Sequence, residues 1–355
     1  PLAGPALNQL DKAIEDQVLA DGGHRSRNPS RQLACLRQLL DIRGILAAAR
    51  VEAPDGLQRG IDRMAPILRL FKMGDGGLAV FNGGSEEEPA EVEAALALAA
   101  FKGRALASAP HLGFQRLSAG RLAVVVDAGA PAEAPFDTGA HAGTLAFEAS
   151  SGRDRLVVNC GTPLIEGPLA EAMRATAAHS ALTIDDHNTA EIIDGGGIGR
   201  RPGQVTVLRR QHEGALWMET AEDGYKSPPY GLFHRRTFYL APGGEELRGE
   251  DWLTRLPGND GAARKATARF HLHPLTQASL LSGGKGVLIK LASGQGWRFL
   301  VRGGEVTLEE SLYLGEPGHR RKAQQIVVTG RVPAISEDVG GTGLKLQWAF
   351  HREKR

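Results

Sequence analysis

The spacing of hydrophobic residues changes near residue 110, and the two sides of this change predict different secondary structure. Before it, Leu7, Leu10, Ile14 and Val18 recur every three or four residues, which is the spacing of one helical face. Similar spacing returns in three further segments, at residues 33–40, 61–71 and 91–101. We therefore predict a helical domain over residues 1–109.

Polar and turn-forming residues mark where these helices begin and end. Asn28 precedes Pro29, and this pair suits a helix start, because the asparagine side chain accepts hydrogen bonds from free backbone N–H groups. Residues 74–77, Gly-Asp-Gly-Gly, end the third helix. The second predicted helix thus begins next to the loop 21–28, which contains His24, Arg25 and Arg27.

After residue 110 the hydrophobic residues recur mostly at every second position, in short runs separated by Gly, Pro and Asp. The runs lie at residues 122–126, 145–147, 205–207, 216–218, 287–291, 297–301, 306–308 and 344–350. Many short alternating strands with frequent turns predict an antiparallel β-sandwich over residues 110–355. Helices followed by strands place the chain in the α+β class.

Composition narrows the classes of function. The formal net charge of +1 over 355 residues argues against a broad nucleic-acid-binding surface, although a local basic groove for an acidic polymer stays open. No apolar run approaches the length of a membrane span, and no signal peptide is visible. Cys35 and Cys160 are the two cysteines, and we expect two buried thiols.

Three polar residues stand at the edges of predicted strands. His141, Asn159 and His179 each lie at the end of a short apolar run, so one sheet can bring two imidazoles and a side-chain oxygen together. These are ligand types for a zinc-like ion.

The order of these motifs resembles a known family. A His followed by small residues and Phe147, a strand that ends in Asn159-Cys-Gly-Thr, and Arg174-Ala-Thr-Ala-Ala-His-Ser-Ala-Leu resemble the C-terminal region of the heparinase II/III-like polysaccharide lyases. The resemblance runs from about Asp21 to the end. It implies an α/α toroid of helical hairpins packed against a β-sandwich. Four helices cannot complete a toroid, so we expect the chain to be part of a longer protein.

The resemblance also implies an activity, namely β-elimination across a uronic-acid linkage in an acidic polysaccharide, without an organic cofactor. The site must neutralise the substrate carboxylate and move protons. The resemblance makes Asn28 the candidate for neutralisation, and His24, His141 or Tyr225 the candidates for proton transfer. The candidates for substrate binding are Arg25, Arg27, Tyr230, His234 and Arg235. A plain N-cap is an equal alternative for Asn28, and for Tyr225 taken alone a tyrosine packed in a turn is the favoured interpretation.

Three departures from the family pattern bear on this prediction. Asn159 stands where the family usually has Asp, which leaves two alternatives for the His141–Asn159–His179 cluster: one structural zinc ion, or a metal-free hydrogen-bonded cluster. Gly139 stands where many relatives carry a histidine that serves in the reaction, and Phe114 where they often carry tyrosine. A catalytically weak glycan-binding or cell-envelope protein is therefore the first rival to the lyase.

A second rival is a glycoside hydrolase, but the aspartates are too scattered to nominate a pair. Relatives often work at the cell envelope, so a periplasmic or cell-envelope location is the expectation. The sequence gives no indication of the oligomeric state.

Overall fold

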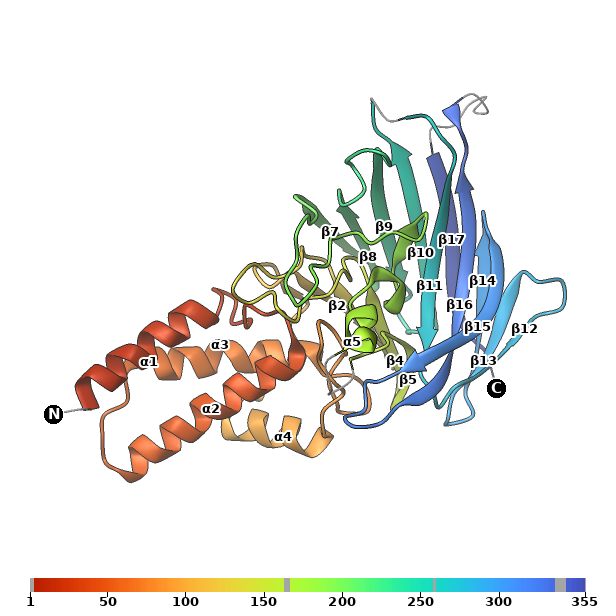
Figure 1. Ribbon diagram of the computed structural model, residues 1–355. Coiled ribbons are helices and arrows are strands. Elements are labelled where there is room, and N and C mark those ends of the chain that lie inside the picture. The colour runs from red at the N-terminus through yellow and green to blue at the C-terminus, as the bar shows by residue number, and fades with distance from the viewer. Residues whose placement is uncertain (1–2, 163–166, 258–259, 336–342, 355) are drawn as a thin grey trace.

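The computed structural model describes residues 3–162, 167–257, 260–335 and 343–354. It has a bundle of helices at one end and two large antiparallel sheets at the other (Figure 1). The α+β class and the β-sandwich predicted from the sequence are confirmed. No helix among the described residues has both the length and the apolar character needed to cross a membrane.

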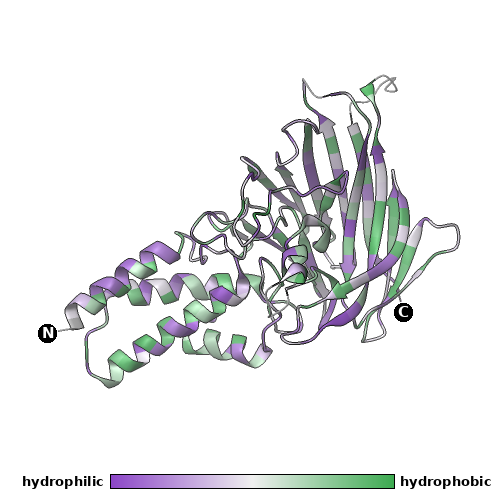
Figure 2. Ribbon diagram, in the orientation of Figure 1, coloured by the Kyte–Doolittle hydropathy of each residue, from purple (hydrophilic) through white to green (hydrophobic). Residues whose placement is uncertain are grey.

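The helical part consists of α1 (Ala3–Gln17), α2 (Pro29–Ala48), α3 (Asp55–Phe71) and α4 (Pro89–Leu98). Hydrophobic and hydrophilic residues alternate along these helices (Figure 2). α3 packs against the other three helices, and its buried face includes Ile61, Met64 and Leu68. The same core continues into the first sheet through Phe114 and Val125, so the helices lie directly on the sandwich.

The first sheet has the order β1-β2-β3-β4-β5-β11-β16-β15, and β6 pairs with β11. Its strands are β1 (Ser108–Ala109), β2 (Phe114–Ala119), β3 (Leu122–Asp127), β4 (Phe147–Ser151), β5 (Asp154–Val158), β6 (Leu182–Ile184), β11 (Arg264–Leu272), β15 (Glu305–Tyr313) and β16 (Arg321–Val332). Between β5 and β6 lie two short helical segments that the sequence pattern did not predict, α5 (Pro168–Met173) and η1 (Thr176–Ala178).

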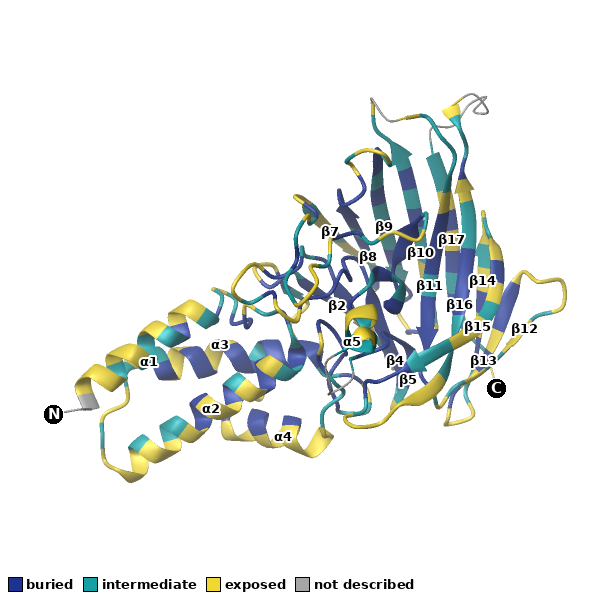
Figure 3. Cartoon of the chain, in the orientation of Figure 1, coloured by how far each residue is buried: buried dark blue, intermediate teal, exposed yellow. Residues whose placement is uncertain are grey.

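The second sheet has the order β12-β13-β14-β17-β10-β9-β8-β7. Its strands are β7 (Val205–His212), β8 (Ala215–Glu222), β9 (Leu232–Leu240), β10 (Glu246–Arg255), β12 (Gln277–Leu280), β13 (Gly286–Lys290), β14 (Gly296–Arg302) and β17 (Gly343–Arg352). Buried and partly exposed residues alternate along its central strands (Figure 3), as expected where one face packs on the other sheet.

Aromatic rings fill the space between the two sheets. Phe147 of the first sheet stacks on Trp348 of the second with ring centroids 5.5 Å apart, and Phe270 meets the same indole edge-on at 5.1 Å. All three side chains are buried. This layer fixes how the two sheets lie on one another, because aromatic pairs have preferred geometries as well as a large buried area.

A buried guanidinium joins the first sheet to the loops around the helices. Arg155 on β5 lies with its Nε 2.6 Å from Asp75 Oδ2, and its nitrogens are also 3.6 Å from Glu86 Oε1 and 3.5 Å from Glu148 Oε2. The Arg155 side chain is almost entirely shielded from solvent. Asp75 and Glu86 follow α3, so this cation holds the helical part against the sheet.

Replacing Arg155 with Met is expected to lower the free energy of unfolding by roughly 3–5 kcal/mol, because Asp75, Glu86 and the fully buried Glu148 lose the cation that they share. Chemical denaturation measures the change. Arg153→Met is the matched control, since Arg153 lies two residues away and is exposed. Equal stability of the two variants would contradict this role for Arg155.

Candidate functional site

A pocket of about 680 Å³ opens between the helical part and the loops at the edge of the first sheet. Its lining includes His24 and Asn28 from the loop before α2, and Gly139 and His141 from the loop before β4. Residues that are more than a hundred positions apart thus meet at one place. The structure brings three of the four predicted catalytic residues together here.

His24 is held by its own loop. Its Nδ1 accepts a hydrogen bond from the backbone N–H of Ser26 at 3.2 Å and lies 2.8 Å from the Ser26 hydroxyl. Burial, with a smaller contribution from Arg31, lowers the pKa of His24 to about 4. The ring is therefore neutral at physiological pH, and because Nδ1 accepts, the hydrogen-bond network assigns the ring proton to Nε2.

Asn28 caps α2 in the way that the alternative interpretation predicted. Its Oδ1 accepts hydrogen bonds from the backbone N–H groups of Ser30 at 2.8 Å and Arg31 at 3.1 Å. Its Nδ2 donates to the carbonyl of Asn82 at 2.8 Å. The amide lines the pocket, but both of its polar atoms already hold the start of α2 in place.

His141 and His179 form the centre of a hydrogen-bonded chain. His179 Nδ1 lies 2.7 Å from the carbonyl of Ala175 and must donate to it, so His179 Nε2 accepts from His141 Nδ1 at 2.9 Å. His141 Nε2 then accepts from the Thr162 hydroxyl at 3.2 Å. This assignment satisfies every ring nitrogen with both imidazoles neutral.

The electrostatics of both rings agree with neutral imidazoles. Burial, His179 and Arg174 together lower the pKa of His141 well below its ordinary value. Burial lowers the pKa of His179 to about 4, although its bond to Ala175 acts in the opposite direction. Neither ring is a cation near neutral pH.

Asn159 braces the loops without a hydrogen bond to either imidazole. Its Nδ2 donates to the carbonyl of Val80 at 3.0 Å and to Glu148 Oε1 at 3.3 Å, and its Oδ1 accepts from the backbone N–H of Ser180 at 2.9 Å. Two acceptors face Nδ2, so an amide suits this position, whereas a carboxylate would repel both of them.

These residues do not fit a zinc site. Within the described part of the chain, no group of three or more His, Cys, Asp or Glu side chains is placed to hold a metal ion. The imidazole nitrogens of His141 and His179 satisfy each other, and the Asn159 oxygen is occupied by a backbone N–H. The donor set therefore suits the metal-free alternative.

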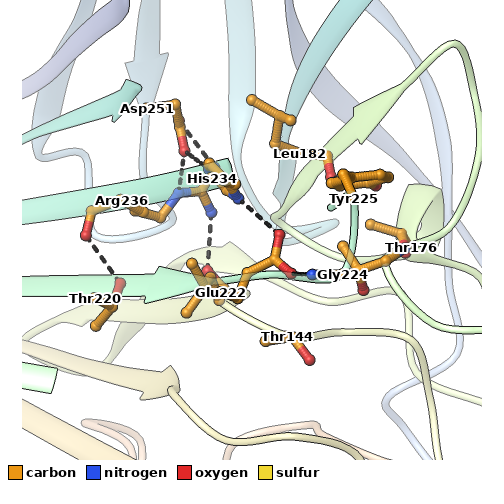
Figure 4. Close-up of polar contacts among 12 residues, drawn as sticks. Thr144, Thr176, Leu182, Thr220, Glu222, Gly224, Tyr225, His234, Arg236 and Asp251 are labelled. Carbon is orange, nitrogen blue, oxygen red and sulfur yellow. Dashed lines mark hydrogen bonds and ion pairs between the residues drawn. The ribbon is translucent and has the colours of Figure 1, made fainter. Parts of the chain in front are cut away.

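Tyr225 does not reach the pocket. Its ring is completely buried in the sandwich, and its hydroxyl lies 2.9 Å from the carbonyl of His187 and 3.1 Å from that of Leu182 (Figure 4). Burial raises the pKa of Tyr225 well above its ordinary value. The predicted role of Tyr225 in proton transfer is wrong for this structure, because no glycan can touch a hydroxyl inside the sandwich.

His234 also lies inside the sandwich, in a charged cluster. Its Nε2 is 2.8 Å from Asp251 Oδ1 and its Nδ1 is 3.3 Å from Glu222 Oε1, while Arg236 Nε lies 2.7 Å from the same Asp251 oxygen (Figure 4). All four side chains are buried. The prediction that His234 binds substrate is therefore wrong, and this histidine serves the fold.

The remaining predicted substrate-binding residues do not line the pocket either. Arg27 is buried, pairs with Asp127 and donates to the carbonyl of Leu112, so its predicted role in substrate binding is wrong. Arg25 is exposed beside the pocket-lining residues. Tyr230 packs against His187 and Tyr225, and Arg235 stacks over Trp252 on the outer face of the second sheet.

Sequence reasoning missed Asn82, which connects the two sides of the pocket. Its Oδ1 accepts from the backbone N–H of His141 at 3.2 Å, and its Nδ2 donates to the carbonyl of Arg27 at 3.1 Å. Asn82 adopts a positive φ of 49° ahead of Gly83 and Gly84. An Asn-Gly-Gly run directly after the apolar run 78–81 is the sequence signal that could have identified this turn.

Arg31 and Arg174 were also missed as pocket-lining residues. Arg174 donates to the carbonyls of Ala140 and Gly197, so it holds the pocket wall. Arg31 is exposed in the first turn of α2. Its position three residues after the capping Asn28 was the signal that could have placed its side chain near the pocket.

Replacing Asn159 with Asp is expected to lower the free energy of unfolding by roughly 1–3 kcal/mol, because a carboxylate cannot donate to Val80 and Glu148. We further expect zinc to raise the melting temperature of this variant and to leave that of the unmodified protein unchanged. Asn8→Asp on the exposed surface of α1 is the control. Zinc stabilisation of the unmodified protein, with zinc found by elemental analysis, would show that the metal-free interpretation is incorrect.

Because the pKa of buried His234 is shifted, we expect the stability of the protein to depend on pH. Burial acts to lower its pKa, but hydrogen bonds and charges from Asp251 and Glu222 outweigh burial and raise the pKa above 6.5. This stabilisation is complete below the pKa of the unfolded chain and is lost as pH rises through the folded pKa. We expect the free energy of unfolding to fall as the pH rises above 6.5, and His234→Gln to abolish that decrease.

Urea denaturation at several pH values tests the His234 prediction. His319→Gln, which changes an exposed histidine, should keep the pH dependence of the unmodified protein. A His234→Gln protein that loses stability with pH as steeply as the control would disprove the role of His234.

Comparisons with known proteins agree with this geometry. Residues 102–345 match the family described as heparinase II/III-like, C-terminal. The chain is 34% identical to FtsZ-localized protein C of Caulobacter vibrioides, over 98% of this chain and 61% of that protein.

Among solved structures, heparan sulfate lyase HepC from Pedobacter heparinus has a TM-score of 0.76 at 16% identity and heparinase III one of 0.75 at 10% identity, each over 98% of this chain and 56% of the other. The chain thus spans only part of these relatives, and the structural likeness shows the fold. The match of the family model over most of the chain shows that it belongs to the heparinase II/III-like family.

Proposed function

We propose that the pocket between the helices and the sandwich binds a carboxylated glycan, and that this chain does not eliminate across the bound linkage at the rate of a lyase. The observation that carries the proposal is that the pocket keeps groups for holding an anion, whereas both of its imidazoles have lowered pKa values and are weak bases. His24 presents a neutral ring N–H, Arg31 is exposed beside it, and α2 begins at Asn28. A helix N-terminus and a guanidinium both favour a carboxylate.

Elimination needs a base strong enough to remove the proton next to the carboxylate, and an acid for the leaving oxygen. The lone pair on His141 Nε2 is the candidate for this base. The pKa of His141 is well below its ordinary value, however, so the ring is a weak base. Its lone pair also accepts from Thr162. No tyrosine is among the described residues that line the pocket.

Gly139 marks the place where the family resemblance expects a histidine. It lines the pocket and is exposed, and a Cβ added there would meet nothing within 4 Å. The pocket thus has room for the missing imidazole. This supports a protein that keeps the family fold but lacks one of the side chains that elimination needs.

The Caulobacter relative favours a second candidate function, a role at FtsZ. Its name gives a location, and the identity of 34% extends over 98% of this chain. We propose that the protein localises with FtsZ, which a fluorescent fusion imaged together with labelled FtsZ tests. A periplasmic or cell-envelope location stays a prediction, and a fusion with diffuse fluorescence would contradict the FtsZ proposal.

An assay with acidic polysaccharides tests the glycan proposal against the lyase. The purified protein is incubated with polygalacturonate, heparan sulfate and chondroitin sulfate, and binding is followed by calorimetry while ultraviolet absorbance reports unsaturated uronate. We expect binding without growth of absorbance. Growth of the ultraviolet absorbance at the rate of a lyase would support the elimination activity that the resemblance implies. Absence of all binding would contradict the proposal that the pocket binds a glycan.

Installing the missing imidazole gives a sharper test. Gly139→His is expected to raise formation of unsaturated product roughly a hundredfold above background, since a placed general base typically contributes that much or more. Gly139→Ala is the matched control, because it adds a Cβ to the same open space without a base. Equal product formation by the two variants would contradict the view that Gly139 marks the missing base.

A further inference from the structure

The outer face of the second sheet carries an open groove of about 1050 Å³, separate from the pocket described above. One row of side chains crosses the sheet at a single level, as the strand register shows. The row runs through Arg210 (β7), Trp217 (β8), Tyr239 (β9), Arg248 (β10), Ala349 (β17) and Leu300 (β14). These strands lie side by side on the far side of the sandwich from β11 and β16 (Figure 1).

Two aromatic rings stand in this row where solvent reaches them. Trp217 is 40% exposed, and its ring centroid lies 5.0 Å from that of Tyr239. The Arg248 guanidinium sits over the Tyr239 ring at 5.3 Å. An exposed tryptophan within a groove is costly to leave in water and offers a flat apolar surface for a ligand.

The next row of side chains in the groove is polar. It includes Glu219, Thr237, Glu250 and Gln347, which present hydroxyl, amide and carboxylate groups beside the aromatic pair. A flat ring next to hydrogen-bonding side chains suits a ligand that has one apolar face and many hydroxyls.

The charge of the groove is positive once its internal pairs are counted. Glu246 pairs with Arg248 and His351, Glu219 with Arg235, and Glu250 with Lys345. The exposed groove residues Arg210, Lys285 and Arg302 have no acidic partner among the described residues. Unpaired guanidinium groups at β7 and β14, on either side of the aromatic pair, favour a ligand with carboxylate or sulfate groups.

The groove is poorly suited to a peptide. A peptide that adds a strand needs a free sheet edge, which this sheet offers at β7; such a strand would lie beside the groove, because β8, β9, β10, β17 and β14 are each paired on both sides. A peptide helix needs a continuous apolar groove, whereas charged and amide side chains interrupt this one. A sugar chain needs neither backbone pairing nor an unbroken apolar surface.

We propose that this groove binds an acidic oligosaccharide, with Trp217 stacked on a sugar ring and Arg210 and Arg302 contacting its anionic groups. The site is distinct from the pocket at the helices, so it does not depend on the function proposed for that pocket. The groove is thus a second site at which the protein binds an anionic glycan.

Calorimetry with oligogalacturonate, dextran sulfate and neutral dextran tests the groove, using the whole chain. We expect both anionic probes to bind, neutral dextran not to bind, and Trp217→Ala to weaken binding roughly fivefold to tenfold. Arg302→Ser, an exposed change that leaves the aromatic pair intact, should also weaken binding. Trp252→Ala is the matched control, since Trp252 lies on the same face but outside the groove.

Several results would overturn the groove proposal. They are an absence of anionic sugar binding, equal binding of neutral dextran, and equal effects of Trp217→Ala and Trp252→Ala. Displacement of the sugar by polyglutamate that depends on Trp217 would instead assign the groove to an acidic polypeptide. Binding that survives Trp217→Ala and Arg302→Ser but is lost in Arg31→Ser belongs to the pocket at the helices, so the two sites are distinguished.

Discussion

The pocket exists because two buried amides tie the loops of the sandwich to one short segment beside the helices. Asn159 donates to the carbonyl of Val80, and Asn82 accepts from the backbone of His141 while it donates to the loop before α2. Loops from three parts of the chain therefore meet at residues 80–82. An amide both donates and accepts, so it connects such segments without a metal ion and without a net charge.

Hydrogen bonds between neutral groups also explain the chemistry of the pocket. The lone pair of each imidazole is occupied by a neighbour, that of His24 by Ser26 and that of His141 by Thr162, and His141 also donates to His179. A fully satisfied buried network is rigid and keeps its groups neutral, which suits recognition of an anion better than abstraction of a proton. The family fold is retained, and we propose that the groups that would drive elimination are replaced or occupied.

Much of the fold was predictable, because the change from helical spacing to alternation is a direct consequence of side-chain geometry. The meeting of His141 and His179 was expected from the apolar runs beside them, although the structure places both residues in loops, before β4 and before β6. By contrast, the sequence did not predict which face of β9 packs inward. Polar His234 and Arg236 share the inward face with Leu232, Phe238 and Leu240, while aromatic Phe233 and Tyr239 point outward, so the apolar residues alone separate the two faces only weakly. Partners from other parts of the chain, Asp251 and Glu222 for His234 and also the carbonyls of Leu145 and Ser180 for Arg236, stabilise that orientation.

The most direct test of the central claim follows the first step of elimination alone. The protein is incubated with an oligogalacturonate in D₂O, and NMR measures deuterium at the carbon next to the carboxylate. Exchange at this carbon needs only a working base, whether or not the glycosidic oxygen leaves. The account predicts that the bound sugar stays undeuterated, whereas incorporation of deuterium that requires His141 would show that the pocket retains the base we infer it has lost.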